Sequence, residues 1–498
     1  MTFLLLATLG LPAVGAVAAV AVRGDRAGRI AGTAFAALAF VASVLLVTGD
    51  RTGLGGAVLT PRPWAQVDVA WVPGLDLRFH LGVDGISYPL IVLTTLLTLL
   101  CCLYTIWHVP DGGRGATLVA LMLVVEVGIV GTFLALDLVL FFVFFEVVLL
   151  PMYAIIAGWG GEDRRHAARK FALYTLFGSV LLLVGVFTVV AAAGTADLIT
   201  LTSGAADLSR GTQLAAFTLL AIAFAVKSPL WPLHTWLPDA HTQAPTVGSV
   251  ILAGVLLKMG TYGLIRVAVG VAPEGARWAS PVLGLLAVAA ILVGCLVCLA
   301  QNELKRLIAY SSVGHMGFVL LGVATLTATG LQAALIGNIA HGIITGLLFF
   351  LAGAVKDRFH TGDLAALGGL RERMPTLSGL LAFAAIASLG LPGLAGFWGE
   401  AFAVVASFQR GGFLWVLYGV LAAVGGALTA AYFLRMLRKV THGPASPVVS
   451  LGAPSLSRVE LVAWSPLIVL AVVVGLLPAL VLAISDVPVA LLVEAVAR

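Results

Sequence analysis

The sequence predicts an all-α, polytopic membrane protein of about fourteen transmembrane helices, of which helices 7 and 12 are interrupted. Hydrophobic residues make up 61% of the 498 residues, charged residues only 10%, and the mean hydropathy is +1.10. Apolar windows recur along the whole chain, and two of them are broken by prolines and glycines. This number of polar residues is too small to cover the surface of a soluble domain. A soluble enzyme is therefore excluded.

The fourteen windows are each long enough for a transmembrane helix, which needs about 20 mostly apolar residues. They are 2–22, 29–48, 84–107, 115–135, 138–158, 169–194, 212–235, 245–269, 279–300, 307–326, 331–356, 375–405, 413–435 and 463–485. The longest polar stretches, 49–83 and 436–458, are predicted to be loops. No basic stretch alternates with aromatic residues on a polar surface, so the sequence predicts no nucleic-acid partner.

The distribution of positive charge predicts the orientation. The N-terminal run MTFLLLATLGLPAVG lacks a basic segment before it, so we expect a retained first helix rather than a cleaved signal peptide. When successive loops are assigned to alternating sides of the membrane, 18 Lys and Arg residues fall on one side and 8 on the other. The remaining two lysines lie in the membrane. Because positive residues favour the cytoplasmic side, both termini are predicted to lie on the opposite, outer side of the membrane.

The two interruptions lie in predicted helices 7 and 12. The first, in 227–245, contains four prolines, and the second, in 389–400, contains Pro392 and four glycines. Broken helices inside a bilayer are tolerated where they pack in protein or line a wet cavity, and a pair of them is typical of inverted-repeat transporters. Since they lie five helices apart, we predict two inverted five-helix repeats. The predicted units are 1–114, 115–269, 279–437 and 459–498.

Two lysines lie in apolar runs: Lys227 in AIAFAVKSPLW and Lys258 in LAGVLLKMGTY. The chain has six lysines against 22 arginines, so their placement at membrane depth is not a consequence of composition. A charged amine at the bilayer centre costs about 2.5–3.5 kcal/mol on insertion scales. A partner carboxylate, a water-filled cavity or loss of the proton relieves that cost, and all three are typical of proton or ion transfer.

Acidic and histidine residues offer partners to these lysines. Glu146, in a helix apolar on every face, is either a packing residue or the partner of Lys227. His234 follows Lys227 by seven residues across two prolines, and His315 and His341 lie among small and hydroxyl residues. Each histidine taken alone is more often a satisfied core residue, but together with two lysines and Glu400 they are compatible with a proton relay.

Other polar residues have less definite roles. Asp137 and Asp239 lie at predicted helix ends, where loop or capping roles compete with catalysis. Glu126 lies within the membrane, and no neighbour in sequence identifies its partner. His241 and Arg266 lie near the predicted interfaces and are interpreted as anchoring or gating residues.

The four cysteines are predicted to be packing residues. Cys295 and Cys298 form a CxxC pair, but the pair lies in an apolar helix without a second pair or a histidine nearby. Metal binding is disfavoured because, apart from this cysteine pair, no predicted transmembrane helix carries two ligands at i,i+3 or i,i+4 spacing.

Four segments resemble a known family: LALDLVLFFVFFEVVLLPMY, KSPLWPLHTWLPDAHTQAPTVGSVILAGVLLKMGTYGLIR, NELKRLIAYSSVGHMGF and LPGLAGFWGE. They are similar to the antiporter-like membrane subunits of respiratory complex I and, within that family, to the M group of NADH-quinone oxidoreductase. Glu400, where related subunits carry lysine, and the absence of a long lateral helix favour the M group.

The resemblance implies residue roles and partners. It implies proton translocation by Glu146, Lys227, Lys258 and Glu400, with His234, His315 and His341 as relay positions. It also implies L- and N-type neighbours and the lipid bilayer as partners, no cofactor on this chain, and FMN, iron–sulfur clusters and quinone in other subunits. Redox catalysis would therefore lie elsewhere in an NADH:quinone oxidoreductase.

Two alternatives remain open at this point. A multisubunit Na⁺/H⁺ antiporter or a hydrogenase-type membrane complex could contain a subunit of the same fold. A membrane scaffold whose buried charges only fix helix packing is the third possibility.

Overall fold

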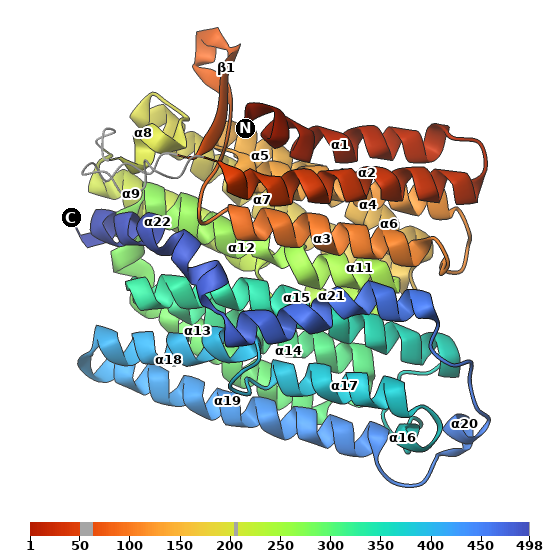
Figure 1. Ribbon diagram of the computed structural model, residues 1–498. Helices are drawn as coiled ribbons and strands as arrows, with labels where there is room; N and C mark the ends of the chain where they lie inside the picture. Colours follow the sequence, from red (N-terminus) through yellow and green to blue (C-terminus); the bar gives the residue numbers. More distant parts are fainter. Residues whose placement is uncertain (50–62, 204–207, 498) are drawn as a thin grey trace.

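The computed structural model describes residues 1–49, 63–203 and 208–497, in which antiparallel helices form one elongated bundle (Figure 1). The first part contains α1 (Thr2–Ala21), α2 (Asp25–Leu45), η1 (Leu46–Thr48), α3 (Tyr88–Thr105), α4 (Gly115–Leu134), α5 (Leu138–Val147), α6 (Leu149–Trp159), α7 (Arg164–Ala193), α8 (Leu198–Thr202), α9 (Arg210–Lys227), α10 (Trp236–Gln243), α11 (Thr246–Ile251), η4 (Leu252–Leu256), α12 (Leu257–Gly263) and η5 (Leu264–Val269). Both η4 and η5 are π-helical, so α11 to η5 form one continuous helix.

The second part continues with the same alternation of direction. It contains α13 (Pro273–Ala300), α14 (Leu304–Thr325), α15 (Ala328–Phe359), α16 (Leu370–Arg373), α17 (Pro375–Ser388), α18 (Gly396–Arg410), α19 (Gly412–Thr441), α20 (Pro447–Ser450), α21 (Arg458–Leu476) and α22 (Ala479–Ala497). The N- and C-termini lie toward the same, left-hand end of the helices in Figure 1.

Thirteen helices of the described residues are long and apolar enough to cross a membrane, which confirms the predicted polytopic membrane fold. Predicted helices 7 and 12 are not among these thirteen. The structure divides helix 7 into α9 and α10, and helix 12 into α17 and α18. The thirteen include α22, which the sequence analysis did not separate from α21.

The break between α21 and α22 corrects the predicted last helix at 463–485. Pro478 has no N–H to continue the helix and disfavours helical geometry at the residue before it. Leu477 accordingly leaves the helical conformation, with φ −126° and ψ 63°. The last crossing is therefore kinked and extends to Ala497.

A β-hairpin stands at one end of the bundle, in the segment 49–83 that was predicted as a polar loop; residues 50–62 of that segment lie outside the described ranges. The hairpin pairs β1 (Ala65–Val72) with β2 (Leu77–Val83), with Ala65 opposite Val83. It is the only sheet in the described part of the chain. Its far end, Val69 to Val72 of β1, is exposed, whereas His80 to Val83 of β2 are buried against the bundle.

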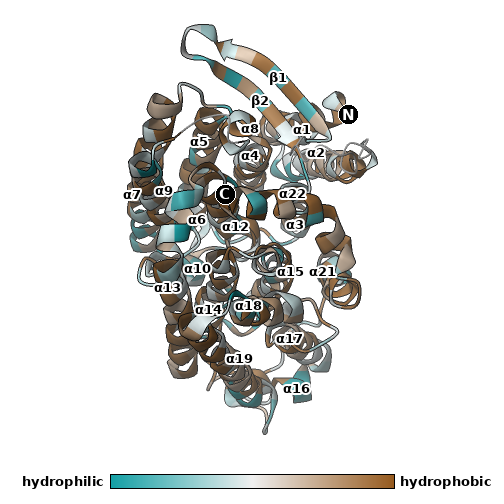
Figure 2. Ribbon diagram, turned by 90° about the vertical axis from the view of Figure 1, so that its left-hand side faces the viewer, coloured by the Kyte–Doolittle hydropathy of each residue, from teal (hydrophilic) through white to brown (hydrophobic). Residues whose placement is uncertain are grey.

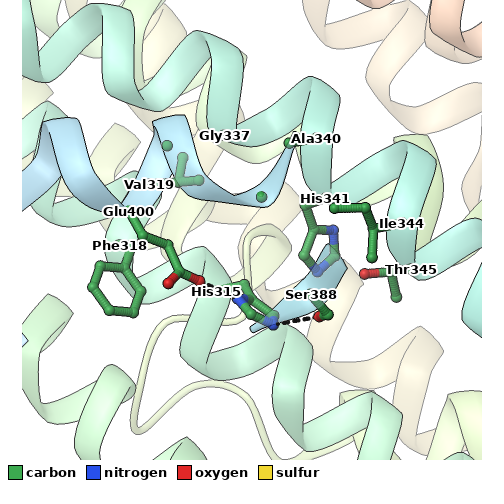
Figure 3. Close-up of a pocket in the computed structure, with 12 residues that line it drawn as sticks. His315, Phe318, Val319, Gly337, Ala340, His341, Ile344, Thr345, Ser388 and Glu400 are labelled. Atoms are coloured by element: carbon green, nitrogen blue, oxygen red, sulfur yellow. Dashed lines mark hydrogen bonds and ion pairs between the residues drawn. The ribbon is translucent and has the colours of Figure 1, made fainter. Parts of the chain in front are cut away.

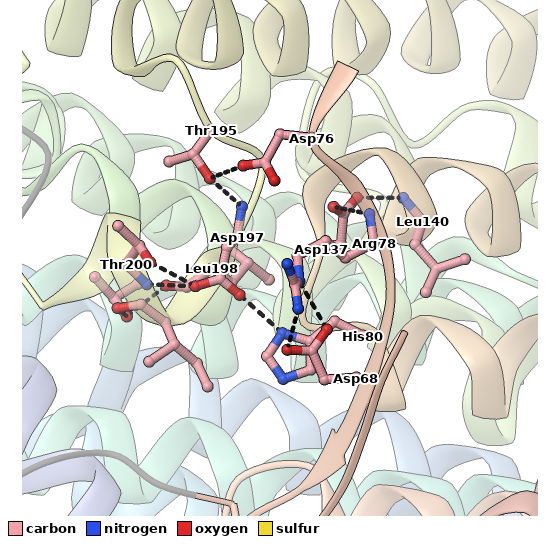
Figure 4. Close-up of polar contacts among 12 residues, drawn as sticks. Asp68, Asp76, Arg78, His80, Asp137, Leu140, Thr195, Asp197, Leu198 and Thr200 are labelled. Carbon is pink, nitrogen blue, oxygen red and sulfur yellow. Dashed lines mark hydrogen bonds and ion pairs between the residues drawn. The ribbon is translucent and has the colours of Figure 1, made fainter. Parts of the chain in front are cut away.

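Polar contacts attach this hairpin to the helices (Figure 4). His80 Nδ1 lies 2.8 Å from Asp197 Oδ1, at the start of α8, and the His80 carbonyl accepts from Leu136 N at 2.9 Å. At its root, Asp84 forms a buried ion pair of 2.8 Å with Arg266 in η5. The hairpin is thereby joined to the helix that carries Lys258.

The interior of the bundle is formed by α11 to η5, α14 and α15. The segment Thr246–Val269 is 100% buried, whereas the apolar windows of α7 and α19 are each only 33% buried. Figure 2 looks along the helices and shows α12, α14 and α15 inside, with apolar residues over the outer helices. The apolar outer faces can therefore contact lipid or neighbouring subunits. The charged residues of the interior are shielded from lipid and from other subunits by the outer helices.

Two strand-like bridges have the same geometry in the two halves of the chain. At the first, Leu138 N donates to Ala196 O and Leu198 N to Leu136 O. At the second, Leu304 N donates to Gly362 O and Leu364 N to Asn302 O, so all four positions are offset by 166 residues. They lie at opposite ends of the bundle, near α8 and α16 in Figure 1. The inverted repeat and its boundaries stay a prediction, which this matched pair supports.

Candidate functional site

Lys227 is the last residue of α9, where the predicted interruption begins. Pro229 cannot continue the helix, and the freed carbonyl of Val226 accepts instead from Trp236 Nε1 at 3.0 Å. Lys227 is 2% exposed, and its Nζ has no hydrogen-bond partner among the described residues. The Nζ lies 4.7 Å from the centre of the Phe145 ring, which makes a cation–π contact.

Glu146 is the charged side chain that interacts electrostatically with Lys227, from the helix that also carries Phe145. Its carboxylate accepts a hydrogen bond from Ser179 in α7 and does not contact the lysine directly. No ion pair within 4.0 Å joins these two residues in the described structure. Glu146 and Lys227 are thus neighbours that do not touch. The Ser179 hydroxyl contacts Glu146, and the Phe145 ring contacts Lys227.

A glycine allows the two lysine-bearing segments to approach each other. A Cβ at Gly260 of α12 would lie 2.7 Å from Ser228 N and 2.8 Å from Phe224 O, so only glycine fits against the end of α9. Lys258 is two residues earlier in the same short helix.

Lys258 is 0% exposed and has two hydrogen-bond acceptors. Its Nζ donates to Ala253 O at 2.5 Å, a carbonyl of the π-helical segment η4, and lies 2.6 Å from His341 Nδ1 in α15. While Lys258 is charged, its ammonium has only donors, so Nδ1 of His341 accepts and the single hydrogen of the neutral ring stands on Nε2. This Nε2 has no partner among the described residues.

Glu400 and His315 form the second contact pair. Glu400 Oε1 lies 2.8 Å from His315 Nδ1, and the two side chains are 16% and 11% exposed. The other ring nitrogen, Nε2, lies 3.0 Å from Ser388 Oγ. The rings of His315 and His341 have their centres 5.9 Å apart at an angle of 65°.

The interruption of predicted helix 12 brings both partners to His315. Helix α17 ends at Ser388, and α18, which carries Glu400, begins at Gly396. Between them, Gly390 and Gly393 have φ values of +78° and +93°, which residues with a Cβ rarely adopt. The broken backbone thus places a hydroxyl and a carboxyl on opposite nitrogens of one imidazole.

A cavity joins the two contact pairs (Figure 3). About 30 Å³ of it is open to the centre of a water molecule, enough for one or two waters. Its polar lining is His315, His341, Thr345, Ser388 and Glu400. Lys258, His341, His315 and Glu400 therefore form a chain of donors and acceptors in the protein interior.

His234 is not part of this chain. Its ring lies edge-on to Tyr310, with the ring centres 6.2 Å apart, and Lys170 is the charged residue with which it interacts. The structure thus brings His315 and His341 together, and no hydrogen bond or ring contact joins His234 to either of them in the described residues.

His241, expected near a membrane interface, and Lys305 are both buried. His241 is 0% exposed and stacks on Phe349 with ring centres 4.6 Å apart, and neither nitrogen has a partner in the described structure. Lys305 is 4% exposed and donates to Ala244 O at 3.2 Å. The only sequence signal for either was its proximity to an apolar run. Arg266 forms an ion pair with Asp84, and its anchoring or gating role stays a prediction.

The remaining acidic residues fall into two groups. Asp137 caps α5 by accepting from Val139 N and Leu140 N, and Asp239 pairs with Lys170 at 2.7 Å and with Arg306 at 3.3 Å. Glu126 is 0% exposed, and neither carboxyl oxygen has a hydrogen-bond partner among the described residues.

No group of three or more potential metal ligands occurs in the described residues, and the four cysteines are buried. Cys295 Sγ lies 3.4 Å from Thr429 Oγ1, and Cys298 Sγ donates to Leu307 O. The two thiols of the CxxC pair thus contact different helices.

Comparison with known proteins identifies the family. A family model described as "NADH:quinone oxidoreductase/Mrp antiporter, TM" matches residues 135–425, more than half of the chain. NADH-quinone oxidoreductase subunit M of Rhodobacter capsulatus is 40% identical over 485 residues, which cover 94% of this chain and 92% of the relative. The chain belongs to the NADH-quinone oxidoreductase subunit M family.

Other relatives agree with the subunit M family. NAD(P)H-quinone oxidoreductase chain 4 1 of Synechococcus sp. (strain JA-3-3Ab) is 44% identical over 387 residues, covering 76% of this chain and 72% of that protein. A chain in the structure of respiratory complex I from Thermus thermophilus with bound NADH has a TM-score of 0.86 at 29% identity, with 99% of both chains covered. A chain of the Mrp complex from Dietzia sp. DQ12-45-1b has a TM-score of 0.85 at 22% identity, which shows a shared fold alone.

Proposed function

We propose that this chain is a proton-pumping membrane-arm subunit of an NADH:quinone oxidoreductase. The observation that carries the proposal is the buried sequence of contacts from Lys258 through His341 and His315 to Glu400, in a member of the subunit M family. A packing role alone does not require a basic and an acidic residue joined by two imidazoles around a polar cavity.

The Glu146–Lys227 pair is the proposed input of this relay. Redox chemistry in other subunits would change the charge near Glu146 and move the balance between its contact with Ser179 and an ion pair with Lys227. Since Lys227 and Lys258 lie on either side of the close contact at Gly260, a change of charge on one acts on the other.

Cofactors and partners follow from the family. FMN, iron–sulfur clusters and quinone are assigned to other subunits, and L- and N-type antiporter-like subunits are the proposed neighbours in the membrane arm. The proposed location is a bacterial cytoplasmic membrane with both termini periplasmic, which corresponds to the side of the hairpin in Figure 1.

Replacing Lys258 by alanine tests the proposal. The assembled complex should keep its NADH-oxidising arm but lose most proton uptake in inverted membrane vesicles, together with most coupled quinone reduction. Lys439→Ala is the matched control, because Lys439 is an interfacial lysine that contacts only Asn302 in the described structure. Normal proton uptake by assembled Lys258→Ala complex contradicts the proposal.

The alternatives give different results. A Na⁺/H⁺ antiporter subunit would purify with other antiporter subunits and without flavin, and the likeness to the Mrp complex supports only the fold. A scaffold would fail to assemble when Lys258 is replaced, because its buried charge would then serve packing.

A further inference from the structure

Ser388 is a buried hydroxyl with an unusual hydrogen bond. Serine and threonine side chains in helices commonly donate to the carbonyl four residues earlier, as Ser407 does with Ala403 O at 2.9 Å. Ser388, the last residue of α17 and 3% exposed, instead contacts His315 Nε2 in another helix at 3.0 Å.

The partner of the opposite nitrogen fixes the direction of this bond. When Glu400 is ionised, His315 Nδ1–H donates to its carboxylate at 2.8 Å. Nε2 of the neutral ring then carries a lone pair, so Ser388 Oγ–H must donate to it. When Glu400 is protonated it donates to Nδ1, and His315 Nε2–H donates back to Ser388. The hydroxyl is compatible with both tautomers because it donates and accepts.

Ser388 also faces the gap in the relay. His341 Nε2 is buried and without a partner in the described structure, and the His341 side chain lines the same cavity as Ser388 and Thr345 (Figure 3). These three polar groups, around about 30 Å³ open to water centres, meet the requirements for an ordered water, which needs two to four partners.

We propose that Ser388 is a proton-transferring residue of the relay, whose hydroxyl joins His315 to His341 through a cavity water and switches direction with the tautomer of His315. This proposal rests on the proposed proton-pumping function and assigns the missing connection within it.

The transfer is balanced in protons and charge. Lys258 gives a proton to His341 Nδ1 while His341 Nε2–H passes its proton to the water. The water passes one to Ser388 Oγ, Ser388 gives its own to His315 Nε2, and His315 Nδ1–H goes to Glu400. Lys258 ends neutral and Glu400 ends protonated, both rings exchange tautomer, and Ser388 and the water are regenerated.

Four variants of the assembled complex test this role: Ser388→Ala, Ser388→Thr, Ser388→Cys and Ser407→Ala. NADH-driven proton uptake and the solvent deuterium isotope effect are measured in inverted vesicles after assembly is verified on native gels. Ser388→Ala should lower uptake by about fivefold, the equivalent of one hydrogen bond, and raise the isotope effect. Ser388→Thr keeps the hydroxyl and should recover most uptake, and Ser407→Ala, the loss of a buried hydroxyl outside the relay, should change neither quantity.

Glu400→Gln, measured in parallel, distinguishes the two proposals. If Ser388→Ala pumps normally while Glu400→Gln does not, Ser388 has no role and the pumping function stands. If Glu400→Gln and Lys258→Ala both pump normally, the proposed function itself is wrong. Should Ser388→Ala fail to assemble, Ser388→Cys supplies the result, because the thiol fills the space but is a weak donor: uptake equal to wild type overturns the role and reduced uptake supports it.

Discussion

The ammonium group of Lys227 lies over the ring of Phe145, 4.7 Å from its centre, although the acidic residue Glu146 is the next residue in the chain. An aromatic face stabilises a cation by about 2 kcal/mol when both are desolvated, less than a direct ion pair in the same place would. Lys227 therefore has two competing partners in one helix, and the structure shows the weaker one in contact.

Removing Lys227 should stop the pump without unfolding it. Lys227→Ala removes a buried charge at a site where the helix is already broken, so assembly should persist while proton-coupled quinone reduction falls by about tenfold or more. Glu146→Ala should resemble it, and Glu146→Asp should be milder because the charge remains. Equal damage by alanine and aspartate at position 146 would indicate that geometry rather than charge matters there.

Phe145→Leu isolates the contribution of the aromatic face. Leucine preserves much of the apolar volume but has no ring to hold the cation, so proton uptake should fall by about threefold to tenfold. Phe145→Tyr keeps the ring and should remain near wild type. Uptake in vesicles decides the matter, and a normal rate with leucine would reduce Phe145 to a packing residue.

Glu400 should be replaceable only by a residue that can exchange a proton. Glu400→Gln retains shape and a hydrogen-bond acceptor for His315, so the variant should assemble and fail to pump. Glu400→Lys still titrates and should retain partial activity. Full pumping by the glutamine variant, together with failure of the lysine variant to assemble, would make Glu400 a packing residue and Lys258 the end of the relay.

Topology can be measured with inserted tags. Tags in 159–168 and 357–374 should be cytoplasmic, and tags at residue 1, in 198–209 and at 498 should be periplasmic; residues 204–207 and 498 lie outside the described structure. Accessibility to a membrane-impermeant reagent in intact cells gives the answer. A cytoplasmic C-terminus would contradict the predicted fourteen crossings.

Acid pH should loosen the hairpin through Asp197. Partial burial raises the pKa of Asp197, but hydrogen bonds with His80 and Thr200 outweigh it, so the pKa lies below the ordinary value of 3.8. A lowered pKa means that the attachment is fully stabilised above pH 3.8 and loses this stabilisation as the pH falls below that value. Hydrogen exchange of residues 65–83, corrected for intrinsic rates, should therefore rise in acid.

Asp197→Asn should raise the same exchange at neutral pH, because the charged acceptor is lost. Asp76→Asn is the matched control, since Asp76 is exposed and the hydrogen bond that it accepts from Thr195 is 3.4 Å long. Unchanged exchange in Asp197→Asn would mean that backbone pairing alone holds the hairpin.

Much of this architecture follows from composition and local chemistry. Apolar windows define the crossings because a bilayer requires about 20 apolar residues, and the breaks after Lys227 and before Glu400 follow from proline and glycine. Buried lysines could be recognised as site residues from their cost alone. The kink at Pro478 carried the same kind of signal, but the apolar run on both sides concealed it.

The contacts themselves could not be predicted. Lys258 and His341 are 83 residues apart, and their 2.6 Å contact depends on how α12 packs against α15. The π-helical segments around Lys258 leave no pattern in an all-apolar stretch, since every face is buried. His241 and Lys305 are buried near helix ends, and burial there depends on neighbouring helices that the local sequence does not show. The roles of the site residues stay predictions until the variants are measured.

The two matched bridges, which pair Asp137 with Asp197 and Glu303 with Asp363, bear on how a membrane potential acts on the protein. Asp137 and Glu303 each cap the start of a helix, and the two helices, α5 and α14, begin at opposite ends of the bundle. Their macrodipoles therefore point in opposite directions and oppose each other. An electric field across the bilayer acts on these two helices in opposite senses, whereas it does work on each proton that the buried side chains move across the membrane.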